Sequence, residues 1–133
     1  MFCDWKDQYS INIESIDVQH HKLFDMVKAL NEALESGQSK AVMGKFLNEL
    51  IQYTQTHFVD EEKYMKDNGF PKRLFDEHVE EHKDLMKQVL AFKVEFETTQ
   101  SVFTPKMITF LVDWLKNHIV RTDNKYAQFI HKR

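Results

Sequence analysis

The amino-acid sequence predicts an all-α protein, specifically an antiparallel up-down-up-down four-helix bundle preceded by an N-terminal arm. Helix-breaking residues are scarce, with three glycines and two prolines among 133 residues, so the chain contains long uninterrupted segments. Within four such segments, apolar residues recur at the three- and four-residue spacing of an amphipathic helix. The connections between the segments are short, which makes neighbouring helices antiparallel.

The first half of the chain contains the arm, expected at residues 1–15, and two helices. The first helix is expected at about 17–35, because its apolar residues have helical spacing and Gly37 is a suitable C-terminal stop. The second helix is expected at about 40–67, directly after Ser39, a residue type that favours the N-cap.

The second half of the chain contains two further helices. The third is expected at about 71–97, with Pro71 in its first turn, where a missing backbone N–H has no cost. The fourth is expected at about 104–131, with Thr104 as its cap. The length suits one core, so we expect a single domain over residues 1–133.

The composition argues against several classes of protein. The net charge is −3 and the charges are interspersed, whereas nucleic-acid binding usually needs a basic patch. There is no apolar run of 18 residues that would predict a membrane span, and no secretory pattern at the N-terminus. Cys3 is the only cysteine, so no internal disulfide is expected. We therefore expect a cytoplasmic protein, and a monomer.

The residues that carry chemistry are histidines and carboxylates on all four predicted helices. They are His20 on the first, His57 and Glu61 on the second, His78 and His82 on the third, and His118 and Asp123 on the fourth. Residues four apart share one helix face, so the second helix presents an imidazole with a carboxylate and the third presents two imidazoles.

The distances of these residues from the connections place them at one level of the bundle. His20 lies 18 residues before residue 38, and His57 lies 19 residues after it. Similar counts hold for the second and third helices about residue 69, and for the third and fourth helices about residue 101. Residues equally far from the turn of an antiparallel hairpin lie side by side, so the sequence predicts one layer of metal-ligand side chains.

Five imidazoles and two carboxylates are too many ligands for one metal ion. Two six-coordinate ions, bridged by both carboxylates and by a solvent-derived oxo or hydroxo group, would use all seven residues and keep one position for a small ligand such as dioxygen. Nitrogen and carboxylate ligands without thiolate favour iron, with manganese or zinc as alternatives. His118 and Asp123 are five residues apart, about 140° around an ideal helix, so we predict a π-type turn between them.

The ordered motifs over nearly the whole chain resemble the hemerythrin family, in particular its bacterial single-domain members. They are Trp5…Tyr9-Ser10-Ile11, Gln19-His20-x-x-Leu23, His57-Phe58-x-x-Glu61, His78-x-x-x-His82 and His118-Ile119-x-x-x-Asp123. The resemblance implies that His78, His82 and His118 hold one non-haem iron, that His20 and His57 hold a second with an open position, and that Glu61 and Asp123 bridge them. It further implies reversible dioxygen binding, for storage, transport or delivery to an oxygen-consuming enzyme.

Apolar neighbours of these ligands are expected to line the oxygen pocket. They are Leu23, Phe24, Phe58, Trp114, Leu115 and Ile119, with Leu115 and Ile119 the best candidates for contact with oxygen. The plainer interpretation is that these side chains chiefly pack the core. His21 and His131 are expected to be a surface residue and an inert terminal residue. Asp60, Glu62, Glu80 and Glu81 are expected to be ordinary surface charge.

Several other functions remain open at this point. A diiron oxidase or peroxidase ranks lower, since ferritin-like enzymes use Glu-x-x-His motifs and the chain has none; we do not expect an enzyme. An oxygen or redox sensor usually carries a fused signalling domain, for which no residues remain. Iron storage is poorly served by two ions per chain. Zinc occupancy would also suit these ligands.

Overall fold

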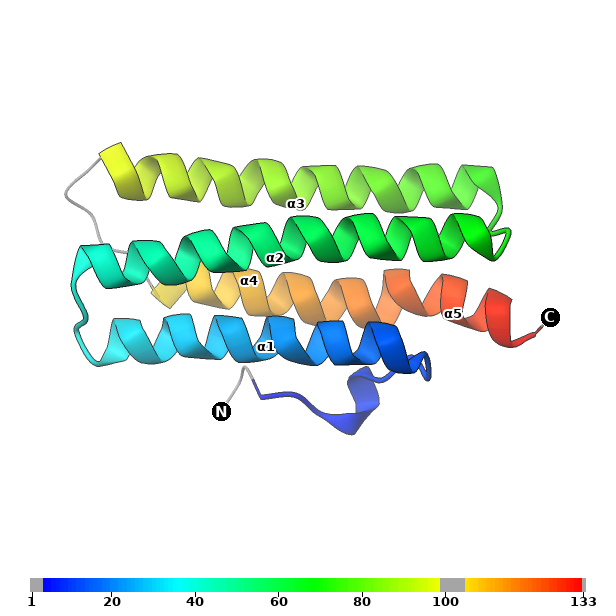
Figure 1. Cartoon of the computed structure of the whole chain (residues 1–133), viewed down its shortest axis with the longest axis horizontal. Helices are drawn as coiled ribbons and strands as arrows, with labels where there is room; N and C mark the ends of the chain where they lie inside the picture. Colours follow the sequence, from blue (N-terminus) through cyan, green and yellow to red (C-terminus); the bar gives the residue numbers. More distant parts are fainter. Residues whose placement is uncertain (1–3, 99–104, 133) are drawn as a thin grey trace.

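The computed structural model describes residues 4–98 and 105–132, and within them it shows four long antiparallel helices packed side by side (Figure 1). The first three are α1 (Glu14–Glu35), α2 (Lys40–Asp67) and α3 (Lys72–Thr98). The fourth runs without interruption through three parts, α4 (Pro105–Asn117), η2 (His118–Asp123) and α5 (Asn124–His131). The predicted fold class is confirmed. The expected cap Thr104 and the lone Cys3 lie outside the described residues.

Glycines end α1 and α2 in the same way. Gly37 and Gly69 have φ of 69° and 74°, a left-handed conformation that costs glycine little. After each glycine, a backbone N–H reaches back into the last helical turn, from Gln38 to Ala33 and from Phe70 to Met65. These bonds satisfy carbonyls that the helix end would otherwise leave without partners. The chain can therefore reverse sharply, which keeps neighbouring helices antiparallel.

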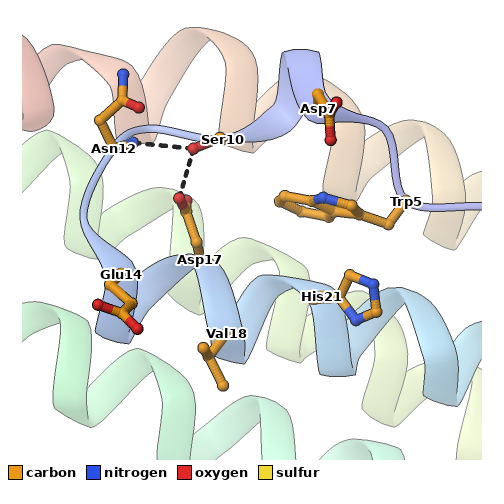
Figure 2. Close-up of a pocket in the computed structure, with 8 residues that line it drawn as sticks. All are labelled: Trp5, Asp7, Ser10, Asn12, Glu14, Asp17, Val18 and His21. Carbon is orange, nitrogen blue, oxygen red and sulfur yellow. Dashed lines mark hydrogen bonds between the residues drawn. The ribbon is translucent and has the colours of Figure 1, made fainter.

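The first helix begins at Glu14, three residues before the predicted start, because Asp17 is engaged by the arm. Its carboxylate accepts hydrogen bonds from the Ser10 hydroxyl and, at 2.9 Å, from the Ile11 backbone N–H. Figure 2 shows the bond from Ser10 to Asp17, and the backbone N–H of Asn12 donating to the Ser10 hydroxyl. Asp17 therefore fixes the arm to α1, and the helix begins one turn earlier.

The arm covers one side of α1 and closes that part of the core. It contains the short helix η1 (Asp7–Tyr9), and the Tyr9 ring stacks on Phe24 with centroids 5.1 Å apart. A surface pocket of about 560 Å³ remains between the arm and α1, lined by Trp5 and His21 among others (Figure 2). His131, expected to be an inert terminal residue, contacts the arm, with its Nε2 3.2 Å from the Ile11 carbonyl oxygen.

The core is a continuous apolar interior contributed by all four helices and the arm. Fully buried side chains include Leu30, Leu47, Ile108 and Val112. Among the described residues, no helix is both long enough and apolar enough to cross a membrane. This packed interior surrounds one strongly polar layer.

Candidate metal centre

The polar layer consists of seven buried side chains from all four helices. They are His20, His57, Glu61, His78, His82, His118 and Asp123, and none is more than 4% exposed. Buried charged groups are costly unless they are paired or bind a metal. The structure therefore brings together, within the interior, every residue that the sequence singled out as a ligand.

Glu61 lies between two groups of histidines. Its Oε1 is 2.9 Å from His78 Nε2, 3.0 Å from His82 Nε2 and 3.9 Å from His118 Nε2. Its Oε2 is 3.3 Å from His20 Nε2 and 3.4 Å from His57 Nε2. We call His78, His82 and His118 the three-histidine group, and His20 and His57 the two-histidine group. Each oxygen of Glu61 therefore faces a different group.

Asp123 divides its oxygens in the same way. Its Oδ1 is 2.9 Å from His78 Nε2 and 3.0 Å from His118 Nε2, whereas its Oδ2 is 3.0 Å from His20 Nε2. Two carboxylates that each offer one oxygen to either side have the arrangement needed to bridge a pair of ions.

The π turn η2 brings Asp123 into the site. The helix has π geometry over His118–Asp123, so these two residues, five apart, lie on one face. The turn expected from their spacing is present in the structure. Such turns often occur at functional sites, and here the π turn makes the fourth helix a donor of both an imidazole and a carboxylate.

Tyr126 adds a hydrogen bond that the sequence did not reveal. It is fully buried, and its hydroxyl donates to Glu61 Oε2 at 3.0 Å. Burial raises the pKa of Tyr126 well above its usual value, and the nearby charges of Glu61 and Asp123 raise it further. The phenol therefore stays protonated and holds the carboxylate of Glu61 in place.

The donor set fits metal ions. Both Asp123 oxygens are buried and close to ring nitrogens, yet neither accepts a hydrogen bond of ordinary geometry. Two sets of ligand atoms lie within 4.8 Å of one another, one formed by Glu61, Asp123 and the three-histidine group, the other by Glu61 and the two-histidine group. Buried carboxylate oxygens and ring nitrogens that converge in this way can bind a metal once the ring nitrogens give up their protons. Imidazole and carboxylate without thiolate suit iron.

In the metal-free chain, protons hold the site together. Burial lowers the pKa of His20, but the adjacent carboxylates of Asp123 and Glu61 outweigh burial and raise this pKa to about 9. The pKa values of His78 and His118 are raised by the same two carboxylates against the effect of burial. Burial raises the pKa of Glu61, but the surrounding histidines hold it well below its usual range. Metal ions must therefore displace protons.

Three polar residues that the sequence did not assign to the site orient its histidines. His57 Nδ1 donates to the side-chain oxygen of Gln19. His82 Nδ1 donates to Glu62 Oε2 at 2.9 Å, and His118 Nδ1 donates to Glu81 Oε1 at 3.2 Å. The interpretation of Glu62 and Glu81 as ordinary surface charge was therefore wrong.

A signal for these partners was present in the sequence. Each is the immediate neighbour of a clustered residue, at positions 19 beside 20, 62 beside 61 and 81 beside 82. A neighbour points about 100° away around its own helix, which in a bundle can be toward the next helix. Gln19 also lies as far before residue 38 as His57 lies after it, so the same comparison of levels would have found it.

An apolar cavity lies in the adjacent layer of the bundle. It has a volume of about 20 Å³ and is lined by Leu23, Val27, Leu50, Thr54, Leu85, Val89, Leu111 and Leu115. Leu23, Thr54, Leu85 and Leu115 each lie three residues from a clustered histidine, so the cavity is one turn away. The Thr54 hydroxyl donates to the Leu50 carbonyl at 2.7 Å, which leaves the cavity without a free donor there.

The other four residues expected to line the oxygen pocket do not line this cavity. Phe58 stacks on His82 with centroids 3.7 Å apart, and Trp114 stacks on His118 at 4.3 Å. Phe24 packs against Tyr9, and Ile119 is buried in the core. His21 is exposed, as expected, and pairs with Asp25. The aromatic rings of Phe58 and Trp114 thus hold imidazoles of the three-histidine group.

Comparison with known proteins identifies the family. The Hemerythrin HHE cation binding domain matches residues 12–130. The chain belongs to the hemerythrin family. It is 33% identical over 126 residues to the bacteriohemerythrin of Clostridium acetobutylicum, covering 92% of this chain and 96% of that protein. It is 32% identical over 123 residues to the bacteriohemerythrin of Stenotrophomonas maltophilia, covering 92% and 78%.

A solved structure of wild-type hemerythrin has the same fold. It superimposes with a TM-score of 0.86 at 30% sequence identity, covering 95% of both chains. Hemerythrins bind non-haem iron and are in general oxygen-binding proteins rather than enzymes. The buried histidines and carboxylates of this family member are a metal-binding cluster of that kind.

Proposed function

We propose that this chain binds dioxygen reversibly at a centre of two non-haem iron ions. The observation that carries the proposal is the division of both carboxylates between two histidine groups. A single ion would not need two carboxylates that each face opposite sides, whereas a bridged pair would. Membership of the hemerythrin family supports the same conclusion.

Each residue then has a role in holding the pair. The three-histidine group would hold one iron and the two-histidine group the other, with Glu61 and Asp123 bridging them. The two-histidine iron has fewer protein ligands, so it would accept the oxygen molecule. The ferrous pair supplies the electrons that reversible dioxygen binding requires.

On one side, the surroundings of the pair exclude water. The layer next to it is apolar, and its cavity of about 20 Å³ has room for one small molecule. Leu23 and Leu115 line this cavity, and Phe24, Phe58, Trp114 and Ile119 complete the apolar surroundings. An apolar setting admits dioxygen, which has no hydrogen bonds to lose. It slows the arrival of protons and water that would promote irreversible oxidation.

The same proposal extends to the chain as a whole. As one hemerythrin domain over residues 1–133, acting as a cytoplasmic monomer, it would store oxygen or deliver it to an oxygen-consuming enzyme. Neither role needs a catalytic residue beyond the iron ligands.

Oxygen cycling tests the proposal. The iron-loaded protein is reduced without air, exposed to oxygen and then deoxygenated while its visible spectrum is recorded. A charge-transfer band that forms with oxygen and is lost on deoxygenation supports reversible binding. Irreversible oxidation on first exposure would favour an oxidase or a sensor, and a colourless protein without response to oxygen would indicate zinc.

A further inference from the structure

The outer ring nitrogens of the clustered histidines have unequal partners. In the three-histidine group, His82 and His118 donate to the carboxylates of Glu62 and Glu81. In the two-histidine group, His57 donates to the neutral amide oxygen of Gln19. The outer nitrogen of His20 is buried and has no hydrogen-bond partner among the described residues. At the outer ring nitrogens, within the described part of the chain, a carboxylate therefore contacts the three-histidine group alone.

Both carboxylates lie partly in solvent. The side chains of Glu62 and Glu81 are 29% and 44% exposed, so water still solvates them. The Thr122 hydroxyl also donates to Glu81 Oε1 at 2.8 Å and fixes its orientation. Each carboxylate is thus anchored in the bundle at its inner end, where it meets a buried imidazole.

The negative charge nearest to the two-histidine group acts through an intermediate. The Gln19 side-chain amide donates to Asp60 Oδ2 at 3.2 Å, while its oxygen accepts from His57. The carboxylate of Asp60 is therefore one residue further from the imidazole than Glu62 or Glu81 is from its own. A neutral amide stands in the position that a carboxylate occupies on the other side.

An imidazole that donates to a carboxylate is a more basic ligand through its inner nitrogen. A more basic ligand favours the higher charge of a ferric ion over a ferrous one. We propose that Glu62 and Glu81 stabilise the ferric state in the three-histidine group, whereas Gln19 preserves the ferrous state in the two-histidine group. The inference rests on the proposed iron centre and deepens it, because the iron with the open position would resist oxidation until oxygen binds.

A charge-neutral exchange gives the sharpest test. The double variant Gln19→Glu with Asp60→Asn keeps the net charge, but places the carboxylate directly against His57 and the amide behind it. The two iron reduction potentials are measured by spectroelectrochemical titration. We predict that the reduction potential of the two-histidine iron falls in this double variant. The potential of the three-histidine iron should rise in Glu62→Gln and in Glu81→Gln. A tenfold change in relative ferric affinity corresponds to about 59 mV.

Glu80→Gln is the matched control for Glu81→Gln. Glu80 is the adjacent residue on α3, its side chain is 68% exposed, and it pairs with Lys83 rather than with a histidine. The control should leave both potentials in place. An equal shift in Glu80→Gln and Glu81→Gln would show only a net-charge effect and overturn the inference. Unchanged potentials in the Gln19–Asp60 exchange would also overturn it.

A second measurement does not depend on redox activity. Ferrous ion titrated into the metal-free protein should bind about 10–100-fold more weakly in Glu62→Gln and Glu81→Gln than in the wild type, and with unchanged affinity in Glu80→Gln. Measurements on the wild type test the proposed function separately. Fewer than two irons or no reversible oxygen band would refute the proposed function. If the wild type holds two irons and shows a reversible band, but the variants leave both potentials unchanged, only the inference is refuted.

Discussion

The stability of the metal-free protein should fall as pH rises from about 6.5 to 9. When a chelator removes the metal, protons remain on the histidines that face Glu61 and Asp123. The pKa of His20 is raised from 6.5 to about 9 in the folded chain, since the two carboxylates outweigh burial. A histidine whose pKa is higher in the folded chain than in the unfolded chain stabilises the fold. This contribution is complete below the unfolded-state pKa and is lost as the pH rises through the folded-state pKa.

The size of the loss follows from that pKa. One pKa unit corresponds to about 1.4 kcal/mol, so the change of His20 alone contributes roughly 3 kcal/mol. The raised pKa values of His78 and His118 act in the same direction. Glu61 and Asp123 have lowered pKa values, so their contributions are lost only on acidification through values below their usual 4.5 and 3.8.

Urea denaturation followed by far-UV circular dichroism measures this effect. The free energy of unfolding of the metal-free protein should be at least about 3 kcal/mol lower at pH 9 than at pH 6.5. The iron-loaded protein is the control, because its ring nitrogens bind metal rather than protons and should not show this loss. A metal-free protein that is equally stable or more stable at pH 9 would refute the account of the site's charges.

Four variants test individual residues of the site. Glu61→Gln should leave fewer than two irons per chain by metal analysis, because the amide cannot offer an anionic oxygen to each histidine group; two tightly held irons would refute its bridging role. Tyr126→Phe should destabilise the metal-free protein by about 1–3 kcal/mol in urea denaturation, the worth of a hydrogen bond to a charged group; an unchanged midpoint would show that this bond contributes nothing. His21→Ala should keep two irons whereas His20→Ala should not, since the side chain of His21 is 52% exposed, and loss of iron from both would contradict the assignment.

The sequence predicted the fold and the seven clustered residues because both depend on regular geometry. Helical periodicity gave the four helices, and equal distances from the turns placed His20 beside His57 at one level. The five-residue step from His118 to Asp123 was also informative, because an ideal helix cannot place both on one face. The π turn η2 resolves that conflict in the way the spacing required.

Contacts between side chains on different helices were harder to predict. Glu62 and Glu81 follow the pattern of solvated charges, and only the relative rotation of α2, α3 and the fourth helix turns them toward His82 and His118. The early start of α1 depends on the arm folding back onto Asp17. Neither rotation nor the path of an irregular segment follows from periodicity, since both are set by packing.

Anomalous diffraction at the iron edge, on crystals of the iron-loaded protein, tests directly whether the site holds two irons bridged by Glu61 and Asp123. We predict two iron peaks, one bound by His78, His82 and His118 and the other by His20 and His57, with Glu61 and Asp123 each contributing one oxygen atom to each iron. A single peak, or two peaks that leave either carboxylate on one ion only, would contradict it.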